Sequence, residues 1–159
     1  MFSIVLSFIL LSFSQSETIP EQNTLVLKLA QDKIGKKVDR GECWDLAKYV
    51  LDKSNSEWKP LYDFGTIIDQ NKETIFPGDI IQFEGVKIER KEKGKTVYYE
   101  TFEHHTAIVY SNEDKNKIKL IHQNTGQFGR KVGVTDFNFL EITKKKSLTI
   151  YRPKAKEKP

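Results

Sequence analysis

The sequence of 159 residues contains a single cysteine, Cys43, and no Asn-X-Ser/Thr sequon. One cysteine cannot close an internal disulfide, so the fold does not depend on disulfide bonds, and N-linked glycans are not expected. Internal repeats and a Gly-, Pro- or Ser-rich linker are also lacking, and the length predicts one domain. The histidines and the cysteine lack the spacing of a zinc site, and no nucleic-acid-binding motif accompanies the net charge of +4. We therefore expect no metal or other cofactor and no nucleic-acid partner.

Charged side chains are absent before Glu17. Residues 2–13 are apolar apart from serines, and this run is shorter than the roughly twenty residues that span a bilayer. The small residues Ser14 and Ser16 suit cleavage by a signal peptidase. We therefore predict a signal peptide over residues 1–16 and a secreted protein without stable membrane insertion after cleavage. The alternative is a membrane anchor formed by residues 1–16.

Two helical patterns come first along the mature chain. Residues 21–33 carry an apolar stripe at Leu25, Val26 and Leu29, and Gly35 follows as a stop signal. Residues 42–53 show the i, i+3, i+4, i+7, i+8 spacing of one buried helix face. The apolar positions of this second helix are Cys43, Leu46, Ala47, Val50 and Leu51.

Strand patterns follow from Phe76 onward. The turn "FPGD" precedes the strand "IIQF", and a hairpin over residues 86–102 has Gly94 in its turn. A second hairpin joins "HHTAIVY" to "IKLIHQN", and "SLTIYRP" is a last strand. Helices followed by strands predict an α+β fold with an antiparallel sheet. We expect one domain over residues 17–153 and a basic, flexible tail over residues 154–159.

The three histidines, His104, His105 and His122, all fall in the second hairpin. An even-length turn in "SNEDKNK" would place His105 directly opposite His122, about 5 Å apart on one sheet face. Asn124 would then be the diagonal neighbour of His105, so either His122 or Asn124 can orient its ring. His104 would point to the other face, where its simplest interpretation is a packing or surface histidine.

Cys43 falls in the first turn of its predicted helix. There the unpaired backbone N–H groups and the helix dipole stabilise a thiolate, and the Cys43 N–H is a candidate oxyanion donor. A helix that supplies Cys43 and a hairpin that supplies His105 contain the parts of a nucleophile with its base. The structural alternative is that Cys43 packs in the core, because free cysteine behaves as a small, buried hydrophobe.

Four motifs together resemble the NlpC/P60–CHAP superfamily of papain-like cysteine peptidases and amidases. "GECWDLAKYV" resembles the helix that starts at the family's nucleophilic cysteine, and "PGDIIQF" resembles its Pro-Gly-Asp turn and first strand. "HHTAIVY" resembles the segment of the catalytic histidine, which implies His105, and "IHQN" the segment of the third polar residue. His122 then matches a histidine of NlpC/P60 members, and Asn124 matches the CHAP asparagine. "GECWDLA" also resembles papain-like domains of some eukaryotic proteins, including a fungal actin-patch scaffold.

This resemblance implies a papain-like NlpC/P60–CHAP fold, with the cysteine on the second helix and an antiparallel sheet or half-barrel. It implies a monomeric, secreted thiol hydrolase that cleaves an amide or peptide bond, for example in a peptidoglycan-like substrate. The implied catalytic residues are Cys43, His105 and His122. Candidates for orienting the base or contacting the substrate are Asn124, Gln123 and Trp44, with packing as the alternative for Trp44. The rival hypothesis is a non-catalytic binding or scaffold module on the same fold.

One feature departs from the family pattern. The long hairpin over residues 86–102 lies between the Pro-Gly-Asp turn and the histidine strand. We expect it to reshape or cover the groove at the cysteine.

Overall fold

The computed structural model describes residues 17–157, which form two α-helices followed by nine β-strands. Helix α1 spans Glu21–Gln31 and helix α2 spans Cys43–Lys53, close to the two predicted helical segments. The expected α+β class with an antiparallel sheet is confirmed. No helix in the described part of the chain is both long and apolar enough to cross a membrane. The predicted signal peptide, residues 1–16, lies outside the described residues.

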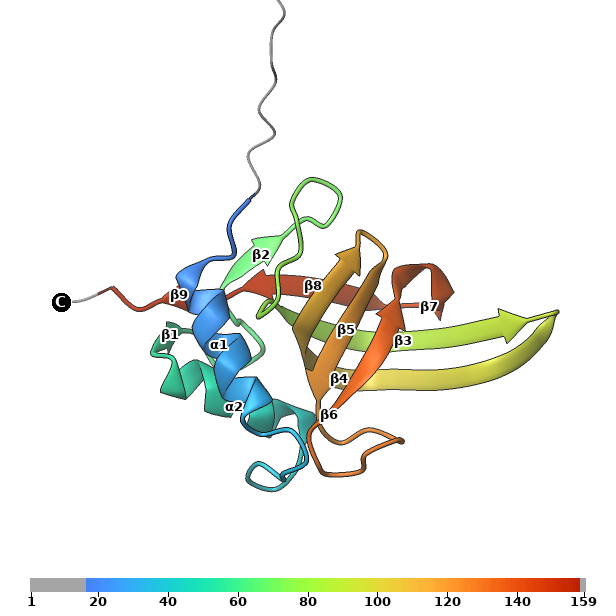
Figure 1. Cartoon of the computed structure of the whole chain (residues 1–159), viewed down its shortest axis with the longest axis horizontal. Helices are drawn as coiled ribbons and strands as arrows, with labels where there is room; N and C mark the ends of the chain where they lie inside the picture. The colour runs from blue at the N-terminus through green and yellow to red at the C-terminus, as the bar shows by residue number, and fades with distance from the viewer. Residues whose placement is uncertain (1–16, 158–159) are drawn as a thin grey trace, which may run out of the picture.

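The main sheet has the strand order β2-β8-β3-β4-β5-β6, with antiparallel pairing throughout, and β7 pairs with β3 beside this path. Two long strands, β3 (Ile80–Glu92) and β4 (Lys95–Asp114), form its centre and continue as a two-stranded arm (Figure 1). A separate pair joins β1 to β9. The shorter elements are β1 (Ser56–Glu57), β2 (Thr66–Ile68), β5 (Lys117–His122), β6 (Gly133–Asn138), the 3-10 turn Phe139–Glu141, β7 (Ile142–Lys144), β8 (Ser147–Arg152) and β9 (Lys154–Ala155).

The sheet separates two apolar clusters. Along β4, Ala107 and Val109 belong to one cluster and Ile108 to the other, as the alternation of side chains in a strand requires. The Ile108 cluster also contains the buried faces of α1 and α2, so both helices cover this face (Figure 1). The predicted apolar face of α2 is confirmed, because four of its five positions are at most 1% exposed: Leu46, Ala47, Val50 and Leu51.

Helix α1 is rotated relative to the predicted stripe. Val26 and Ala30 are fully buried, whereas Leu25 is 42% exposed, so the prediction for Leu25 is wrong. The helix buries Asn23 instead, and its Nδ2 donates to Asp79 Oδ1 at 2.7 Å. Because a buried amide must find hydrogen-bond partners, this contact fixes the rotation of α1 and turns Leu25 toward solvent.

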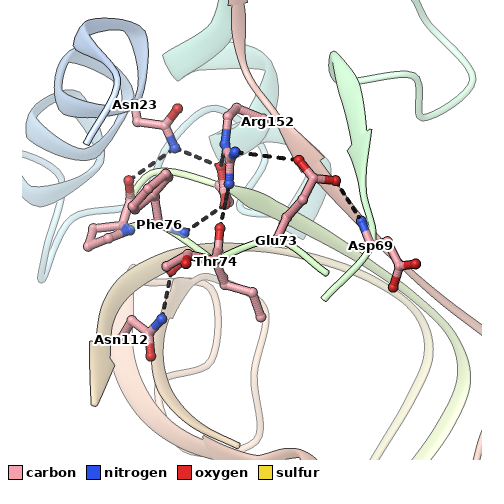
Figure 2. Close-up of polar contacts among 10 residues, drawn as sticks. Asn23, Asp69, Glu73, Thr74, Phe76, Asn112 and Arg152 are labelled. Carbon is pink, nitrogen blue, oxygen red and sulfur yellow. Dashed lines mark hydrogen bonds and ion pairs between the residues drawn. The ribbon is translucent and has the colours of Figure 1, made fainter. Parts of the chain in front are cut away.

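The predicted turn before β3 is held by Asp79, which is fully buried. Its carboxylate accepts hydrogen bonds from the Phe76 N–H at 2.8 Å and from Arg152 Nη2 at 3.0 Å. The same guanidinium donates to Thr74 O at 2.6 Å and approaches Glu73 (Figure 2). Burial raises the pKa of Asp79, and these hydrogen bonds oppose that rise. Together these contacts tie the turn to β8.

The tail prediction is wrong at Lys154. The backbone of Lys154–Ala155 forms β9 and pairs with β1, and the Lys156 N–H donates to Asn55 O at 3.1 Å. The side chains of β9 are exposed, and the strand is held by backbone hydrogen bonds. The sequence pattern therefore did not predict that it pairs with β1.

Candidate active site

Cys43 is the first residue of α2 and follows the N-cap residue Glu42. The Glu42 N–H donates to Asp45 Oδ2 at 3.0 Å, which is one half of a capping box. The box defines where the helix begins, and the first-turn N–H of Cys43 has no intrahelical partner. The predicted position of Cys43 in the first turn is confirmed.

Gln123 holds the loop before α2 in place. Its side chain is fully buried, Nε2 donates to Glu42 O at 2.7 Å and to Val38 O, and Oε1 accepts from the Val38 N–H at 3.1 Å. The amide therefore has partners within the protein on both its donor and acceptor sides. A substrate contact for Gln123 does not fit this burial, and the residue instead positions the start of the cysteine helix.

The sulfur of Cys43 lies against β4. Sγ is 4.0 Å from His104 O, and the residue is 9% exposed. Burial raises the pKa of the Cys43 thiol, and backbone N–H groups of Thr106 and Trp44 act in the opposite direction. The two β4 residues whose backbones contact the sulfur therefore flank His105.

The rings of His105 and His122 meet on one face of the sheet. His105 Nε2 lies 2.9 Å from His122 Nδ1, and His122 Nε2 lies 2.9 Å from Thr135 Oγ1 on β6. The His105 ring also stacks on Phe102, with centroids 4.8 Å apart and planes 17° apart. Burial, and then the charge of His104, lower the pKa of His105 to about 4. Burial also holds the pKa of His122 well below its usual range, so both rings are neutral at pH 7.

The register of the second hairpin differs from the predicted one. Ile108 lies opposite Ile121, so by extension His122 lies opposite Ala107 and is the diagonal neighbour of His105. Bulges in β4, one between Val109 and Ser111, shift the pairing. The prediction of direct opposition is wrong, but the shift is by two residues and leaves both rings on the same face.

His105 Nδ1 is the free atom of this group. Among residues 17–157, only Asn23 Oδ1 and Asn112 Oδ1 are buried side-chain polar atoms without a hydrogen-bond partner. No hydrogen bond within this part of the chain engages His105 Nδ1. An atom that has no partner and is not fully buried keeps some contact with solvent, although His105 as a whole is only 5% exposed.

Asn124 does not reach His105. Strand β5 ends at His122, and Asn124 adopts a left-handed backbone with φ of 62°. Its Nδ2 donates to Glu42 Oε2 at 2.7 Å, so the side chain supports the helix cap. The predicted diagonal contact is therefore wrong, and His122 is the residue that touches the His105 ring.

The other face of β4 presents a second polar group. His104 Nδ1 lies 2.7 Å from Glu84 Oε1, and the His104 ring packs edge-on against Tyr62 at 4.4 Å. Burial raises the pKa of Glu84, but the hydrogen bonds from His104 and Gln82 outweigh it and hold that pKa below its usual value. The expectation that His104 and His105 point to opposite faces is confirmed.

Trp44 packs at the start of α2. Its ring meets Tyr62 at 5.0 Å and Trp58 at 5.5 Å, both edge-on. These ring contacts support the packing alternative for Trp44. They also place aromatic side chains beside Cys43. Tyr62 and Thr135 were not identified from the sequence, because the loop around Tyr62 and strand β6 lack a period that marks them.

A cleft of about 720 Å³ lies elsewhere, between residues 70–77 and 112–115. Asn112 on its wall donates from Nδ2 to Ile75 O at 2.7 Å (Figure 2). Neither Cys43 nor His105 lines this cleft. Within residues 17–157, no group of three or more His, Cys, Asp or Glu side chains is arranged to hold a metal ion.

Comparison with known proteins gives one family. A family model described as the AIM3/BBC1 cysteine proteinase-fold domain matches residues 22–158. Among solved structures, the crystal structure of Ly7917 with the hydrolyzing product of MDP aligns with a TM-score of 0.49 and 14% sequence identity. The alignment covers 82% of this chain and 62% of that chain. A search of curated proteins finds no match in sequence.

Proposed function

The chain belongs to the AIM3/BBC1 cysteine proteinase-fold domain family, and on that premise we propose that it is a thiol hydrolase with Cys43 as nucleophile. One observation carries the proposal. The helix-start sulfur lies against the β4 backbone at His104, the chain neighbour of His105, whose ring is hydrogen-bonded to His122. We further propose that the fold has the NlpC/P60–CHAP arrangement, in which His105 is the base and His122 orients its ring.

One pair of tautomers of His105 and His122 suits a base at His105. If His105 Nε2–H donates to His122 Nδ1, then His122 Nε2–H donates to Thr135 Oγ1. This tautomer leaves the lone pair of His105 Nδ1 free as the base. Thr135 thus accepts the last hydrogen bond of this series and is a positioning residue, because it acts on His105 through His122.

The proposed reaction follows from these roles. Sγ attacks the amide carbonyl carbon while the thiol proton passes to His105 Nδ1, and the Cys43 N–H stabilises the oxyanion. The C–N bond then breaks, and His105 returns the proton to the leaving amine. Water, deprotonated by His105, attacks the resulting thioester and releases the carboxylic acid and the thiol. The proposed substrate class is a peptide or a peptidoglycan-like amide, met outside the cell.

Hydrolysis of defined substrates tests this proposal. The chain is incubated with a mixed peptide library and with peptidoglycan fragments, and new amine and carboxylate ends are identified by mass spectrometry. We expect cleavage by the wild type, no cleavage by Cys43→Ala, and a loss of at least about a hundredfold in His105→Ala. The matched control is His104→Ala, which removes the neighbouring imidazole on the other face and retains cleavage. Cleavage that persists in Cys43→Ala, with unchanged circular dichroism, would contradict the proposal.

A second candidate is a non-catalytic binding module on the same fold. The observation in its favour is the burial of Cys43, which raises the pKa of its thiol. This candidate predicts that Cys43→Ala leaves ligand binding intact and costs about 1 kcal/mol of unfolding free energy, as for loss of a small core side chain. An inert thiol in the wild type would favour it.

A further inference from the structure

The loop over residues 59–63 has an unusual backbone next to the sulfur. Leu61 and Tyr62 are consecutive and have φ of 76° and 66°, the left-handed region that large side chains rarely adopt. The loop is closed by the Lys59 N–H, which donates to Asp63 O at 2.9 Å. The side chain of Leu61 is 90% exposed, so core packing does not explain an apolar residue at this strained tip.

Two contacts place the loop beside Cys43. The Tyr62 ring is 4.4 Å from the His104 ring, and His104 O is 4.0 Å from Sγ. The Tyr62 ring also lies 5.0 Å from Trp44, the residue after Cys43. Burial raises the pKa of the Tyr62 hydroxyl, and the charges of Cys43 and Glu84 add to that rise, in agreement with this placement.

The surroundings of the sulfur are therefore asymmetric. Beyond Trp44 lie Tyr62 and the exposed Leu61, which offer aromatic and aliphatic surface. Before Cys43, by contrast, Glu42 is engaged by Asn124 and by Arg130, at 2.7 and 3.3 Å. The Trp44 side of the sulfur therefore offers apolar contact to a substrate.

We propose that Leu61 and Tyr62 form an apolar subsite that takes an apolar side chain of the substrate next to the scissile amide. This rests on the proposed function and adds the substrate class: peptides with leucine-like or aromatic residues at the cleavage point. The strained backbone holds Leu61 out in solvent, where a substrate side chain can cover it.

Alkylation of Cys43 by peptidyl chloromethyl ketones tests the subsite. Two probes are compared, one ending in Leu-Leu and one in Gly-Gly before the reactive group, together with iodoacetamide, which has no side chain. The variant Leu61→Asn removes the apolar group and tolerates a left-handed backbone. Leu140→Asn makes the same change at a leucine that is 74% exposed in the 3-10 turn Phe139–Glu141, and serves as control.

We expect the Leu-Leu probe to react at least about tenfold faster than the Gly-Gly probe in the wild type, as for other apolar pockets. This ratio should fall by about tenfold in Leu61→Asn and stay constant in Leu140→Asn. An unchanged ratio in Leu61→Asn, while His105→Gln slows both chloromethyl ketones, overturns the subsite alone. Rates for both chloromethyl ketones that are the same in the wild type and in His105→Gln overturn the proposed function and the subsite with it. If Leu61→Asn unfolds, Leu61→Gly gives the same comparison.

Discussion

Two effects of opposite sign act on the Cys43 thiol. The first-turn N–H groups and the Thr106 N–H favour the thiolate, whereas burial disfavours it, and burial has the larger effect on the pKa. His105 is also neutral, because burial lowers its pKa to about 4. A stable thiolate–imidazolium pair is therefore not present in the resting protein. In the proposed mechanism, proton transfer to His105 therefore accompanies the attack of the sulfur on the substrate.

The buried imidazoles predict how stability depends on pH. Unfolded histidine has a pKa near 6.5, whereas folded His105 has a pKa of about 4, so between these values the unfolded chain binds more protons. The unfolding free energy therefore falls as pH falls from 6.5 to 4, by on the order of 3 kcal/mol from His105. The lowered pKa of His122 adds a loss of the same sign. Urea denaturation at each pH measures this fall.

Carboxyl groups titrate in the same window, so variants isolate the histidine contribution. We expect His105→Gln to reduce the slope of unfolding free energy against pH. His104→Gln, at a ring that is 45% exposed, should keep most of that slope. Equal slopes in the two variants would contradict the buried, neutral state of His105.

At the scale of elements, the turn before β3 depends on close backbone approach. Gly78 has φ of 88°, and a Cβ at this position would lie 2.2 Å from Asn23 O. Gly78→Ala should therefore cost about 3 kcal/mol of unfolding free energy or prevent folding, because the strain of a positive φ and the clash with Asn23 O both destabilise the folded state. Gly94→Ala is the control, since its φ is 77° but its Cβ meets open space. It should cost about 1 kcal/mol.

Thermal and urea denaturation measure both glycine variants. Equal losses for Gly78→Ala and Gly94→Ala would mean that the packing of α1 against the turn contributes nothing. A larger loss at Gly78 supports the contact between the α1 backbone at Asn23 and the turn.

The elements with a clear period could be predicted from the sequence. Helix α2 was predicted because five apolar positions repeat at the helical period, and its start places Cys43 correctly. The shared face of His105 and His122 was predicted because alternation in a strand fixes the face. The exact cross-strand register of the two histidines was not predicted. The bulges in β4 that shift it arise from local backbone pairing, which composition does not encode.

Other features depend on contacts between distant segments. The rotation of α1 follows from Asn23 binding Asp79, 56 residues away, and no local pattern indicates it. Thr135 becomes a partner of His122 only because β6 pairs with β5. The catalytic roles of Cys43, His105 and His122 stay predictions.

At the scale of the whole molecule, the β3–β4 arm projects away from α1 and α2 (Figure 1). The side chains of residues 91–97 are all exposed, and Arg90 lies opposite Tyr98 at the base of this tip. The arm therefore does not cover the start of α2, contrary to one expectation from the sequence. Its tip lies beyond the two apolar clusters.

Replacing residues 91–97 by Asn-Gly tests the independence of the arm. Asn-Gly suits a two-residue hairpin turn between Arg90 and Tyr98. We expect the unfolding free energy to change by less than about 1 kcal/mol and the labelling rate of Cys43 to change by less than about threefold. A labelling rate altered tenfold or more would mean that the tip reaches the groove.

The most direct test of the thiol hydrolase is the rate at which the Leu-Leu chloromethyl ketone labels Cys43 at pH 7. The chain has one cysteine, so a single mass shift reports this site alone. Burial raises the pKa of the thiol and makes its alkylation by a small reagent slower than that of free cysteine. A probe that binds as a substrate instead lets His105 take the thiol proton as the sulfur attacks, which makes the reaction faster. We predict a rate at least about tenfold above that of free cysteine, lost in His105→Gln and kept in His104→Gln. A wild-type rate below that of free cysteine, or one unchanged in His105→Gln, would contradict the account.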